Sequence, residues 1–464
     1  MEDLKDSGIL CIFEDDRYPN FFPLSLNKPV FELMLGTQTI LERIVSEINP
    51  SSLLLICREY IQDVAGKLPG ETELDVSVNK VPDEEILFVN GRLLTYEDEL
   101  TTLVEGTATG TLVHKNGIPV VARLEKDAAA SFLGFLEKSL SNESVDRLFG
   151  SFKGQNDEGT EPNEPGIDEV IAIREKALRE WAADNGVVVE ATGAKLLSYY
   201  WQLIGENDKC IIDDFQKTPF RGSAPESELF KGVDLINEDD IIIGADVEVR
   251  SGTVLDASDG PVIIADGASI EPNSIIYGPC YIGEGTIVRG GAKIGKGTSI
   301  GRFCRIGGEV GESIIDSFTN KQHEGFLGHS YIGSWVNIGA GSCNSDLKNN
   351  YGKIRAWQSG RMRETGKRFL GLIAGDHAKI AINTRMNTGS VVGFCSNVMT
   401  IGFPPKFIPS FTWQSEPELI EYELDKAVRT AEIMMDRRNQ EFTSEIMELF
   451  KALYRLCRMS GFNS

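Results

Sequence analysis

Between residues 262 and 306 the chain repeats with a period of six. An aliphatic residue occupies every sixth position, and a small or β-branched residue lies two positions before it. This period differs from the period of about 3.6 in an amphipathic helix and from the alternation in a half-buried strand, and it is typical of a parallel β-helix. We expect the axis of this solenoid to be filled by Ile264, Ile270, Ile276, Ile282, Val288, Ile294, Ile300 and Ile306.

The same rhythm extends in both directions. Residues 256–260 shift its phase by three positions upstream, and residues 343–368, rich in Asn, Lys and Arg, interrupt it downstream. Because an insertion leaves a solenoid at a corner, we expect this interruption to be a surface loop, either part of the working face or a solubilising excursion. The further axis positions are Ile243, Val249, Leu255, Phe326, Ile332, Ile338, Ile380, Met386, Val392 and Val398.

The segment before the repeat has the pattern of an α/β domain. Ile9–Phe13, Leu53–Cys57 and Ile86–Val89 are short apolar strands, and Gln38–Ile48 is an amphipathic helix. Strands that alternate with helices predict an open, largely parallel sheet. Residues 150–166, rich in Gly, Pro and acids, predict a loop.

Helical periodicity returns at Ile167–Asn185 and, after the repeat, at Glu416–Met434 and Glu441–Arg458. The composition around Thr218–Glu228 is that of a linker. These patterns divide the chain into an α/β domain (1–215), a linker (216–238), a β-helix domain (239–412) and a helical carboxy-terminal extension (413–464).

Composition narrows the classes of function. The 464 residues carry a net charge of −24, which argues against nucleic acid or an anionic membrane as a partner. No run of about 18 apolar residues is present, and the acidic amino terminus lacks the basic flank of a secretory signal. The eight cysteines form no CxxC pair, and Cys280 and Cys304 fall on small-residue positions of the repeat. We therefore expect a cytoplasmic protein.

The segment KQHEGFLGHSYIGSWVNIGAGSCNSD, residues 321–346, is more specific than the repeat. It closely resembles the acyltransferase half of the bifunctional N-acetylglucosamine-1-phosphate uridylyltransferase/glucosamine-1-phosphate acetyltransferase family. The phrases SDLKNNYG (345–352), PPKFIPSF (404–411), PLSLNKPVFEL (23–33) and FVNGRLL (88–94) are similar to a divergent branch of that family. The resemblance implies a left-handed β-helix joined to a Rossmann-like sugar-nucleotidyltransferase domain.

The resemblance also implies roles for individual residues in transfer of an acyl group from coenzyme A. His323 matches the family's general base, and histidine titrates near neutral pH. The backbone N–H of Ala340 would face the thioester carbonyl of the acyl-CoA. The acceptor sugar and its phosphate would be held by Arg289, Arg305, Asn337, Asn344 and Asp346.

Two departures from the family pattern concern the acceptor sugar. Phe326 replaces a family tyrosine, and Gly307 replaces a family lysine for which Arg305 is a substitute.

Three of the four histidines lie in the β-helix, and γ-class carbonic anhydrases share this fold and bind zinc through three histidines. Because His323 and His329 are six residues apart, they fall on different walls, so we expect no metal site within one chain.

The amino-terminal domain resembles sugar nucleotidyltransferases except at their phosphate loop. Residues 13–21, FEDDRYPNF, contain no glycine where the family has a glycine-rich loop that cradles phosphates. Asn90 stands where the family has a metal-binding aspartate, and an amide holds Mg²⁺ more weakly than a carboxylate. The candidate phosphate or metal contacts are Arg17, Lys28, Asn90, Arg92 and Asn207.

Two functions from different classes follow from these observations. The first is an acyltransferase that uses acetyl-CoA on an amino-sugar phosphate or nucleotide sugar, forms a homotrimer and takes part in UDP-N-acetylglucosamine biosynthesis. Its amino-terminal domain would be a divergent nucleotidyltransferase, with Mg²⁺ as a possible cofactor, or a binding module. The alternative is a non-catalytic nucleotide-sugar sensor or scaffold.

Overall fold

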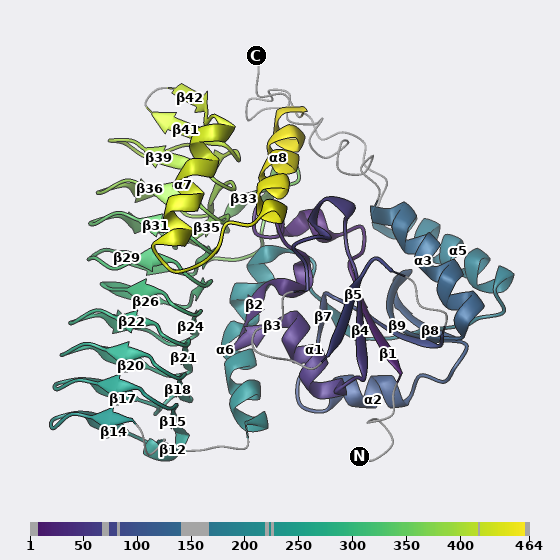
Figure 1. The fold of residues 1–464 in the computed structure, drawn as a ribbon, viewed down its shortest axis with the longest axis horizontal. Coiled ribbons are helices and arrows are strands. Elements are labelled where there is room, and N and C mark those ends of the chain that lie inside the picture. Colours follow the sequence, from purple (N-terminus) through teal and green to yellow (C-terminus); the bar gives the residue numbers. More distant parts are fainter. Residues whose placement is uncertain are drawn as a thin grey trace.

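The computed structural model describes residues 8–66, 74–80, 84–140, 167–218, 222–223, 227–415 and 418–459. The predicted loop at 150–166 lies outside the described residues. A tall solenoid stands beside an α/β domain, and two carboxy-terminal helices lie against the upper coils of the solenoid (Figure 1). The fold class expected from the sequence, an α/β domain followed by a hexapeptide β-helix and a helical tail, is confirmed.

The amino-terminal domain is built on a mixed sheet in which most neighbouring strands are parallel. Strand β1 (Ile9–Phe13) lies between β4 and β6 and runs parallel to both. Strand β9 is antiparallel to its two neighbours. The sheet order is β10 (Val188–Ala191), β8 (Thr111–Lys115), β9 (Ile118–Leu124), β6 (Ile86–Asn90), β1, β4 (Ser52–Ile56) and β5 (Asp75–Val78).

Five helices of the described part of this domain surround the sheet. The predicted helices at 38–48 and 167–185 are present as α1 and α5. A capping box starts α1, because the hydroxyl of Thr39 accepts from the backbone N–H of Glu42 while the Glu42 carboxylate accepts from the Thr39 N–H. The helices are α1 (Ile40–Ile48), α2 (Glu99–Glu105), α3 (Lys126–Leu140), α5 (Ile167–Asp184) and α6 (Tyr200–Lys217).

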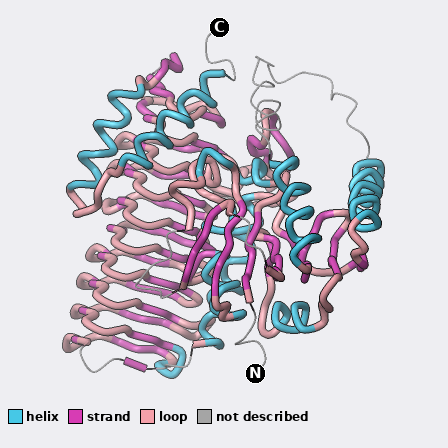
Figure 2. Tube along the Cα trace, turned by 45° about the vertical axis from the view of Figure 1, so that its right-hand side comes forward, coloured by secondary structure: helices cyan, strands magenta, loops and turns pink. Residues whose placement is uncertain are grey.

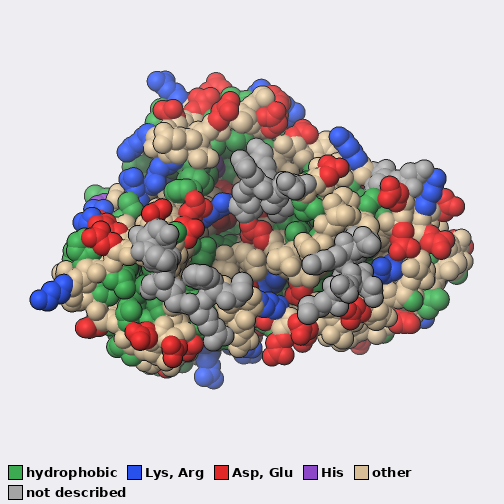
Figure 3. Space-filling view, turned by 60° about the horizontal axis from the view of Figure 1, so that its bottom comes forward, with side chains coloured by type: hydrophobic (Ala, Val, Ile, Leu, Met, Phe, Trp, Pro, Cys, Tyr) green, Lys and Arg blue, Asp and Glu red, His purple; other side chains and the backbone are tan. Residues whose placement is uncertain are grey.

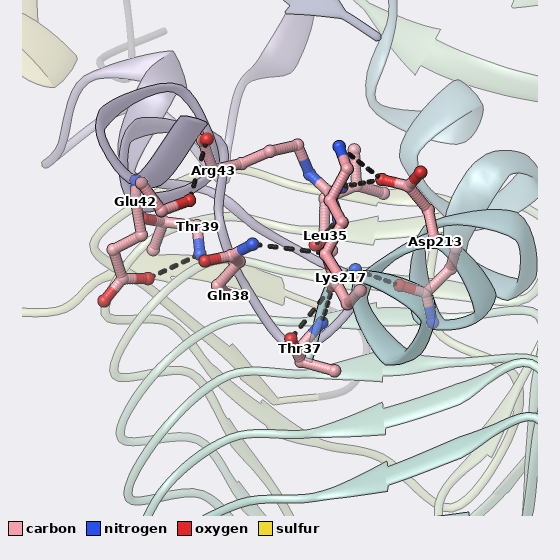
Figure 4. Close-up of polar contacts among 12 residues, drawn as sticks. Leu35, Thr37, Gln38, Thr39, Glu42, Arg43, Asp213 and Lys217 are labelled. Atoms are coloured by element: carbon pink, nitrogen blue, oxygen red, sulfur yellow. Dashed lines mark hydrogen bonds and ion pairs between the residues drawn. The ribbon is translucent and has the colours of Figure 1, made fainter. Parts of the chain in front are cut away.

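Helix α6 joins the domain to the solenoid (Figure 1). Arg43 of α1 donates to Asp213 of α6 at 2.9 Å and forms an ion pair with Asp214, and both partners are buried. Asp214 also accepts from the backbone and the hydroxyl of Thr37, in the turn between β2 (Met34–Leu35) and β3 (Gln38–Thr39). This polar cluster fixes α6 against α1 (Figure 4). A further short pair, β7 (Leu93–Leu94) with β11 (Lys195–Leu196), lies beside it.

The solenoid has three walls of parallel strands stacked in layers (Figure 2). The first wall contains β12 (Gly222–Ser223), β15 (Ile241–Ile243), β18 (Val262–Ile264), β21 (Cys280–Ile282), β24 (Thr298–Ile300), β27 (Ile314–Ile315), β30 (Tyr331–Ile332), β35 (Leu372–Ala374), β38 (Ser390–Val392) and β40 (Phe407–Ile408). The second wall contains β13 (Glu228–Leu229), β16 (Glu248–Val249), β19 (Ser269–Ile270), β22 (Ile287–Val288), β25 (Arg305–Ile306), β28 (Asn320–Lys321), β31 (Asn337–Ile338), β36 (Lys379–Ile380), β39 (Asn397–Met399) and β41 (Thr412–Ser415).

The third wall contains β14 (Asp234–Ile236), β17 (Val254–Asp256), β20 (Ile275–Tyr277), β23 (Lys293–Ile294), β26 (Glu309–Gly311) and β29 (Phe326–Gly328). β32 (Cys343–Asn344) and β37 (Arg385–Met386) form a separate pair after it in the chain. Strands β13 and β14 and part of the first wall thus lie in residues 216–238, the stretch expected to be a linker. The chain turns from wall one to two at the first corner, from two to three at the second corner, and from three to one at the third corner.

The predicted axis residues fill the solenoid, with one exception. The prediction of Phe326 is wrong, because Leu327 pairs with the axis residue Val310 while Phe326 pairs with the exposed Glu309 and is only partly buried. All eight positions of the central repeat are fully buried, and the registers place each above its counterpart one coil earlier, as Ile264, Ile282 and Ile300 show. The phase shift at 256–260 appears as a longer coil, because Ile243 pairs with Ile264 while Ile264 pairs with Ile282.

The first corner carries a column of rings. The residue three positions after the axis residue of the first wall has a positive φ in successive coils, including Phe303, Phe318, Trp335 and His377. Phe318 and Trp335 stack with ring centroids 4.3 Å apart and planes 3° apart, and Phe303 continues the stack at 5.5 Å. One coil below, Gly285 has a φ of +60°, and a Cβ there would lie 2.5 Å from the Phe303 ring. A side chain at Gly285 would therefore be strained by the backbone conformation and by the Phe303 ring together.

The interruption at 343–368 differs from the surface loop that we expected. It contains an antiparallel hairpin, β33 (Arg355–Gln358) with β34 (Arg361–Glu364), whose Ile354, Ala356 and Trp357 are buried. The Trp357 ring stacks on Phe407 at 3.9 Å, and the Trp357 carbonyl accepts from the hydroxyl of Tyr200 in α6. The first strand of the hairpin therefore packs between the two halves of the chain, while the residues before it, such as Tyr351, are exposed.

The carboxy-terminal extension is helical only in part. The prediction of a helix over Glu416–Met434 is wrong at its start, where β42 (Glu418–Glu421) pairs antiparallel with β41. Helix α7 runs over Leu424–Asp436 and α8 over Ser444–Met459. In the described part of the chain no helix combines the length and the hydropathy that crossing a membrane requires. On the face shown in Figure 3, acidic and basic side chains are interspersed, in line with the 70 acidic and 46 basic residues of the sequence.

Candidate functional site

The second corner brings together three residues that the sequence predicted as an acyltransferase site. Arg289 begins the corner after β22, His323 lies in the corner after β28, and Ala340 lies in the corner after β31. The register stacks these coils, since β22 pairs with β25, β25 with β28, and β28 with β31. Parallel strands are about 4.8 Å apart, so these residues span about three coils of one edge.

Two further predicted residues lie on the outer face of the second wall, beside this corner. Arg305 pairs with Asn320, and Asn320 pairs with Asn337, so all three form one outward column. Asn337 is exposed and Arg305 is half-buried. The structure therefore places Arg289, Arg305 and Asn337 around the corner that carries His323.

Arg438, just after α7, reaches the same column and was not identified from the sequence. Its guanidinium donates to Asn320 Oδ1 at 2.7 Å and to the Phe303 carbonyl at 3.1 Å. Burial and the nearby charge of Arg305 both lower the pKa of Arg438. Two cations held close together in this way favour an anion between them. No local signal could have revealed this, because the contact joins residues 118 positions apart.

His323 is the histidine whose surroundings suit proton transfer. Its side chain is exposed, and within the described residues its imidazole makes no hydrogen bond or ion pair. The other three histidines are engaged elsewhere. His114 accepts from the backbone N–H of Gly117, and His377 is buried against the rings of Trp335, Phe394 and Phe450.

His329 is held at the third corner between two acids. Its Nδ1 lies 2.8 Å from Asp346 Oδ2, its Nε2 contacts Glu312, and its ring stacks on Phe369 at 4.8 Å. Burial opposes protonation, but the hydrogen bonds that the imidazole donates to Asp346 and Glu312 outweigh it and raise the pKa of His329 to about 9. A histidine that is protonated at neutral pH cannot accept a proton, so His329 is a poor general base.

The structure does not bring Asn344 and Asp346 to His323 within one chain. Asn344 points into the solenoid, where Oδ1 accepts from the Gly328 N–H at 3.0 Å and Nδ2 donates to the Gly328 carbonyl at 3.0 Å. Asp346 lies at the third corner, paired with His329. Their predicted contact with the acceptor sugar remains a prediction.

The three histidines of the solenoid occupy three different corners: His323 the second, His329 the third and His377 the first. They do not converge within one chain. Among the residues that the structure describes, no cluster of three His, Cys, Asp or Glu side chains has the arrangement of a metal site.

In the amino-terminal domain, the end of β1 is occupied by internal ion pairs. Asp15 accepts from the Arg92 guanidinium, at 2.9 Å from Nε and 2.5 Å from Nη2, and from the Asn90 amide at 2.8 Å. The other groups of Asn90 are also used, because Nδ2 donates to the Pro119 carbonyl and Oδ1 accepts from the Arg92 backbone N–H. All three side chains are buried.

A magnesium ion does not fit the residues proposed for it. The Asn90 oxygen is already an acceptor, and Asp15 is neutralised by Arg92. Asn207 lies elsewhere, at the domain interface, where Oδ1 accepts from the Gly36 N–H and Nδ2 donates to the Gly297 carbonyl. Arg17 is half-buried at the end of β1, with its backbone N–H bonded to Asp15.

Lys28, the lysine of the LNKPV motif, points at the solenoid. Its Nζ lies 2.7 Å from Asp316 Oδ2 and 3.0 Å from Asp376 Oδ2, and Asn27 donates to Asp376 at 2.9 Å. Burial opposes the charge of Lys28, but the two aspartates outweigh it and raise the pKa of the ammonium. In this structure Lys28 joins the two halves of the chain, and its charge is satisfied without a phosphate.

A cavity of about 890 Å³ adjoins this ion bridge. It lies between the amino-terminal domain, the first wall and helix α8, and its lining includes Asn27, Lys28, Arg302, Trp335, His377 and Phe450. Asn27 Oδ1 and His377 Nδ1 are buried and have no hydrogen-bond partner among the described residues. The volume is within the range of small-molecule sites.

Comparison with known proteins shows what parts of each half are similar to. Residues 10–219 match the family described as sugar nucleotidyl transferase, and residues 261–296 match the bacterial transferase hexapeptide with six repeats. A sugar-nucleotidyl-transferase domain followed by a hexapeptide solenoid is the architecture of the bifunctional nucleotidyltransferase/acetyltransferases, so the resemblance to a divergent branch of that family is confirmed.

Individual relatives agree with this class. The chain is 30% identical over 132 residues to the bifunctional protein GlmU of Anaplasma marginale, a match that covers 26% of this chain and 30% of that protein. It is 27% identical over 231 residues to a bifunctional sugar-1-phosphate nucleotidylyltransferase/acetyltransferase of Sulfurisphaera tokodaii, covering 48% of this chain and 51% of that protein. The chain thus spans about a third to a half of the length of these relatives.

Among solved structures, the UDP-N-acetylglucosamine acyltransferase of Francisella novicida matches at 17% identity and a TM-score of 0.20, over 50% of this chain and 78% of that chain.

Proposed function

We propose that this protein is a coenzyme-A-dependent acyltransferase that acts on an amino-sugar phosphate or a nucleotide sugar. The single observation that carries the proposal is the exposed, unpaired imidazole of His323 at the second corner, beside Arg289, Arg305, Asn337 and the Ala340 amide. The acyl donor is acetyl-CoA by analogy with the bifunctional relatives.

The chemistry of each group follows from its position. His323 accepts the proton of the acceptor amine as the amine nitrogen attacks the thioester carbonyl. The imidazolium then returns that proton to the departing sulfur. The new carbon–nitrogen bond forms as the carbon–sulfur bond breaks. Within the described residues the backbone N–H of Ala340 donates to no protein group, so it is available to a developing oxyanion.

The outward column supplies the anion contacts. Arg305 and Arg438 provide two neighbouring cations for a sugar phosphate or diphosphate, and Asn337 adds an exposed amide two strands above Arg305. Arg289 is drawn toward Glu271 Oε1 at 2.7 Å, which keeps its guanidinium at the same edge.

We propose further that the protein is a cytoplasmic homotrimer, with each acyl-CoA cleft lined by neighbouring solenoids. An assembly of this kind would place side chains of a second copy beside the corner of the first. The positions of Asn344 and Asp346, away from His323 in their own chain, are compatible with such sharing for Asp346 but not for the inward-pointing Asn344.

For the amino-terminal domain we propose binding of a sugar nucleotide without nucleotidyl transfer. The ion pairs of Asp15 with Arg92 and of Lys28 with the solenoid consume the groups that would otherwise hold a triphosphate and its metal. The cavity beside Lys28 is the observation that favours the second candidate function, a non-catalytic nucleotide-sugar sensor.

The deciding experiment measures free thiol released from acetyl-CoA in the presence of glucosamine-1-phosphate. We expect release from the wild type, and a loss of about 10²–10⁴-fold in rate for His323→Ala, the typical contribution of a general base. His329→Asn is the comparison variant. Loss in His329→Asn with retention in His323→Ala would reverse the assignment of the base.

Two outcomes separate the candidate functions. No thiol release with any amino-sugar, together with calorimetric binding of UDP-N-acetylglucosamine, would favour the sensor. Pyrophosphate formation from UTP and N-acetylglucosamine-1-phosphate would contradict the loss of nucleotidyl transfer in the amino-terminal domain.

A further inference from the structure

One position of the solenoid axis is occupied by a lysine. Lys321 lies in β28, where it pairs with Ile306 of β25, and the register places Ile338 above it. Its residue surface is 2% exposed, although its neighbours along the axis are aliphatic. An ammonium group in such surroundings loses its hydration, so it requires compensating contacts.

Those contacts are two backbone carbonyls of the second corner. Lys321 Nζ donates to the Gly307 carbonyl at 2.7 Å and to the His323 carbonyl at 2.9 Å. The coil below makes room for this group, because a Cβ at Gly308 would lie 2.9 Å from Nζ. Within the described residues Lys321 forms no ion pair, so its charge is directed at peptide oxygens alone.

The corner that Lys321 holds is wider than the corner below it. Residues Gln322–Gly325 connect β28 to β29, whereas only Gly307 and Gly308 connect β25 to β26. The corners after β19, β22 and β31 also have four residues, so the corner below is the short one, and His323 lies within the four-residue corner. The link from Lys321 to the His323 carbonyl restricts the backbone at the residue that carries the imidazole.

We propose that Lys321 is a positioning residue for acyl transfer, which ties the four-residue corner to the coil below and thereby sets the direction of the His323 side chain. The inference rests on the proposed function of His323. A stabilising role alone is a weaker explanation, because an unbranched apolar side chain would fill the axis without burying a charge.

The inference can be tested through the pH dependence of the rate, because Lys321 acts through its protonated ammonium group. Burial lowers the pKa of Lys321 to about 8, and the nearby charge of Glu324 opposes this effect. Among the described residues, the charged group that acts on Lys321 is Glu324 of its own corner, and Cys343 of the coil above lines the same small cavity. Loss of this proton weakens the two charge-assisted hydrogen bonds, so the wild-type rate should fall as the pH rises through about 8.

The test compares Lys321→Met with Ile306→Met. Both variants place methionine at an axis position, so Ile306→Met controls for the change in packing. Turnover, KM for acetyl-CoA and the pH profile are measured, together with hydrogen–deuterium exchange of peptides covering 321–328. Lys321→Met should lower kcat about 10- to 100-fold with KM within about twofold, lose the decline near pH 8 and exchange faster at the corner.

The inference is overturned if Lys321→Met keeps the wild-type kcat and pH profile, or if exchange at 321–328 is unchanged. It is equally overturned if Ile306→Met shows the same losses, since the effect would then be one of packing. A wild type that transfers no acyl group would refute the proposed function, whereas the exchange comparison would still decide whether Lys321 orders the corner.

Discussion

The ion bridge of Lys28 with Asp316 and Asp376 makes a quantitative prediction. Lys28→Met removes one cation and leaves two carboxylates, whose side chains are 14% and 5% exposed, facing each other without a counter-charge. Breaking a buried pair from one side costs about 3–5 kcal/mol, because the remaining charge stays desolvated. Lys28→Met should therefore lower the free energy of unfolding by about 3–5 kcal/mol at pH 7.

The assay is urea denaturation followed by tryptophan fluorescence, with Lys209→Met as the matched control. Lys209 also lies near an acid, 4.0 Å from Glu206, but its side chain is 64% exposed, so its removal should cost about 0–1 kcal/mol. The double variant Lys28→Met/Asp376→Asn should recover part of the lost unfolding free energy. Burial already raises the pKa of Asp376, so of the two aspartates it is the one whose charge is less favoured.

Two results would refute this reasoning. If Lys28→Met unfolds at the wild-type urea concentration but no longer binds UTP, Lys28 holds a phosphate and the bridge to the solenoid is incidental. Equal destabilisation by Lys28→Met and Lys209→Met would likewise remove the special role of the interface.

Three further changes test other parts of the fold. The folded pKa of His329, about 9, exceeds its ordinary value, so the stabilisation that its charge provides is complete below pH about 6.5 and disappears as the pH rises through about 9. Over that window the free energy of unfolding of the wild type should fall by about 2–3 kcal/mol, and that of His329→Asn by much less. Equal shifts of the urea midpoint in the two proteins between pH 6 and pH about 9.5 would contradict this. Gly285→Ala should cost about 1–2 kcal/mol, because the turn has a φ of +60° and the new Cβ meets the Phe303 ring; an unchanged melting temperature would contradict it. Trp357→Ala should cost about 3–5 kcal/mol by emptying the contact between the hairpin and the rest of the chain, and calorimetry showing less than 1 kcal/mol would contradict burial there.

The regular parts of the fold were predictable because their periodicity is local. Strand β1 matches the predicted Ile9–Phe13 to the residue, and α5 begins at the predicted Ile167. The helix predicted from Glu416 failed at its start because β42 is formed by pairing with β41, and a contact between strands leaves no helical or six-residue period. The hairpin of the insertion was not predicted for the same reason, since its burial depends on contacts with α6 and β40.

The candidate site was predictable only where a motif carried it. Arg289, His323 and Ala340 were identified through the family resemblance, and the register of the strands then places them in stacked coils at one corner. Lys321 was missed because the coil from Ile306 to Lys321 is shorter than the preceding one from Val288 to Ile306, so the six-residue count no longer marked an axis position. Arg438 was missed because its partner lies on another element.

The hydrophobic core has one further consequence. Buried side chains of the first wall and of the corner after it, including Ile314, Tyr331 and Phe394, belong to the same cluster as Phe13 and Leu54 of the amino-terminal sheet. Separating the two halves of the chain would expose an apolar surface on each piece. Among the residues described, the amino-terminal domain shares the covering of this wall with the hairpin and with α8, so loss of nucleotide chemistry alone would not make the domain dispensable.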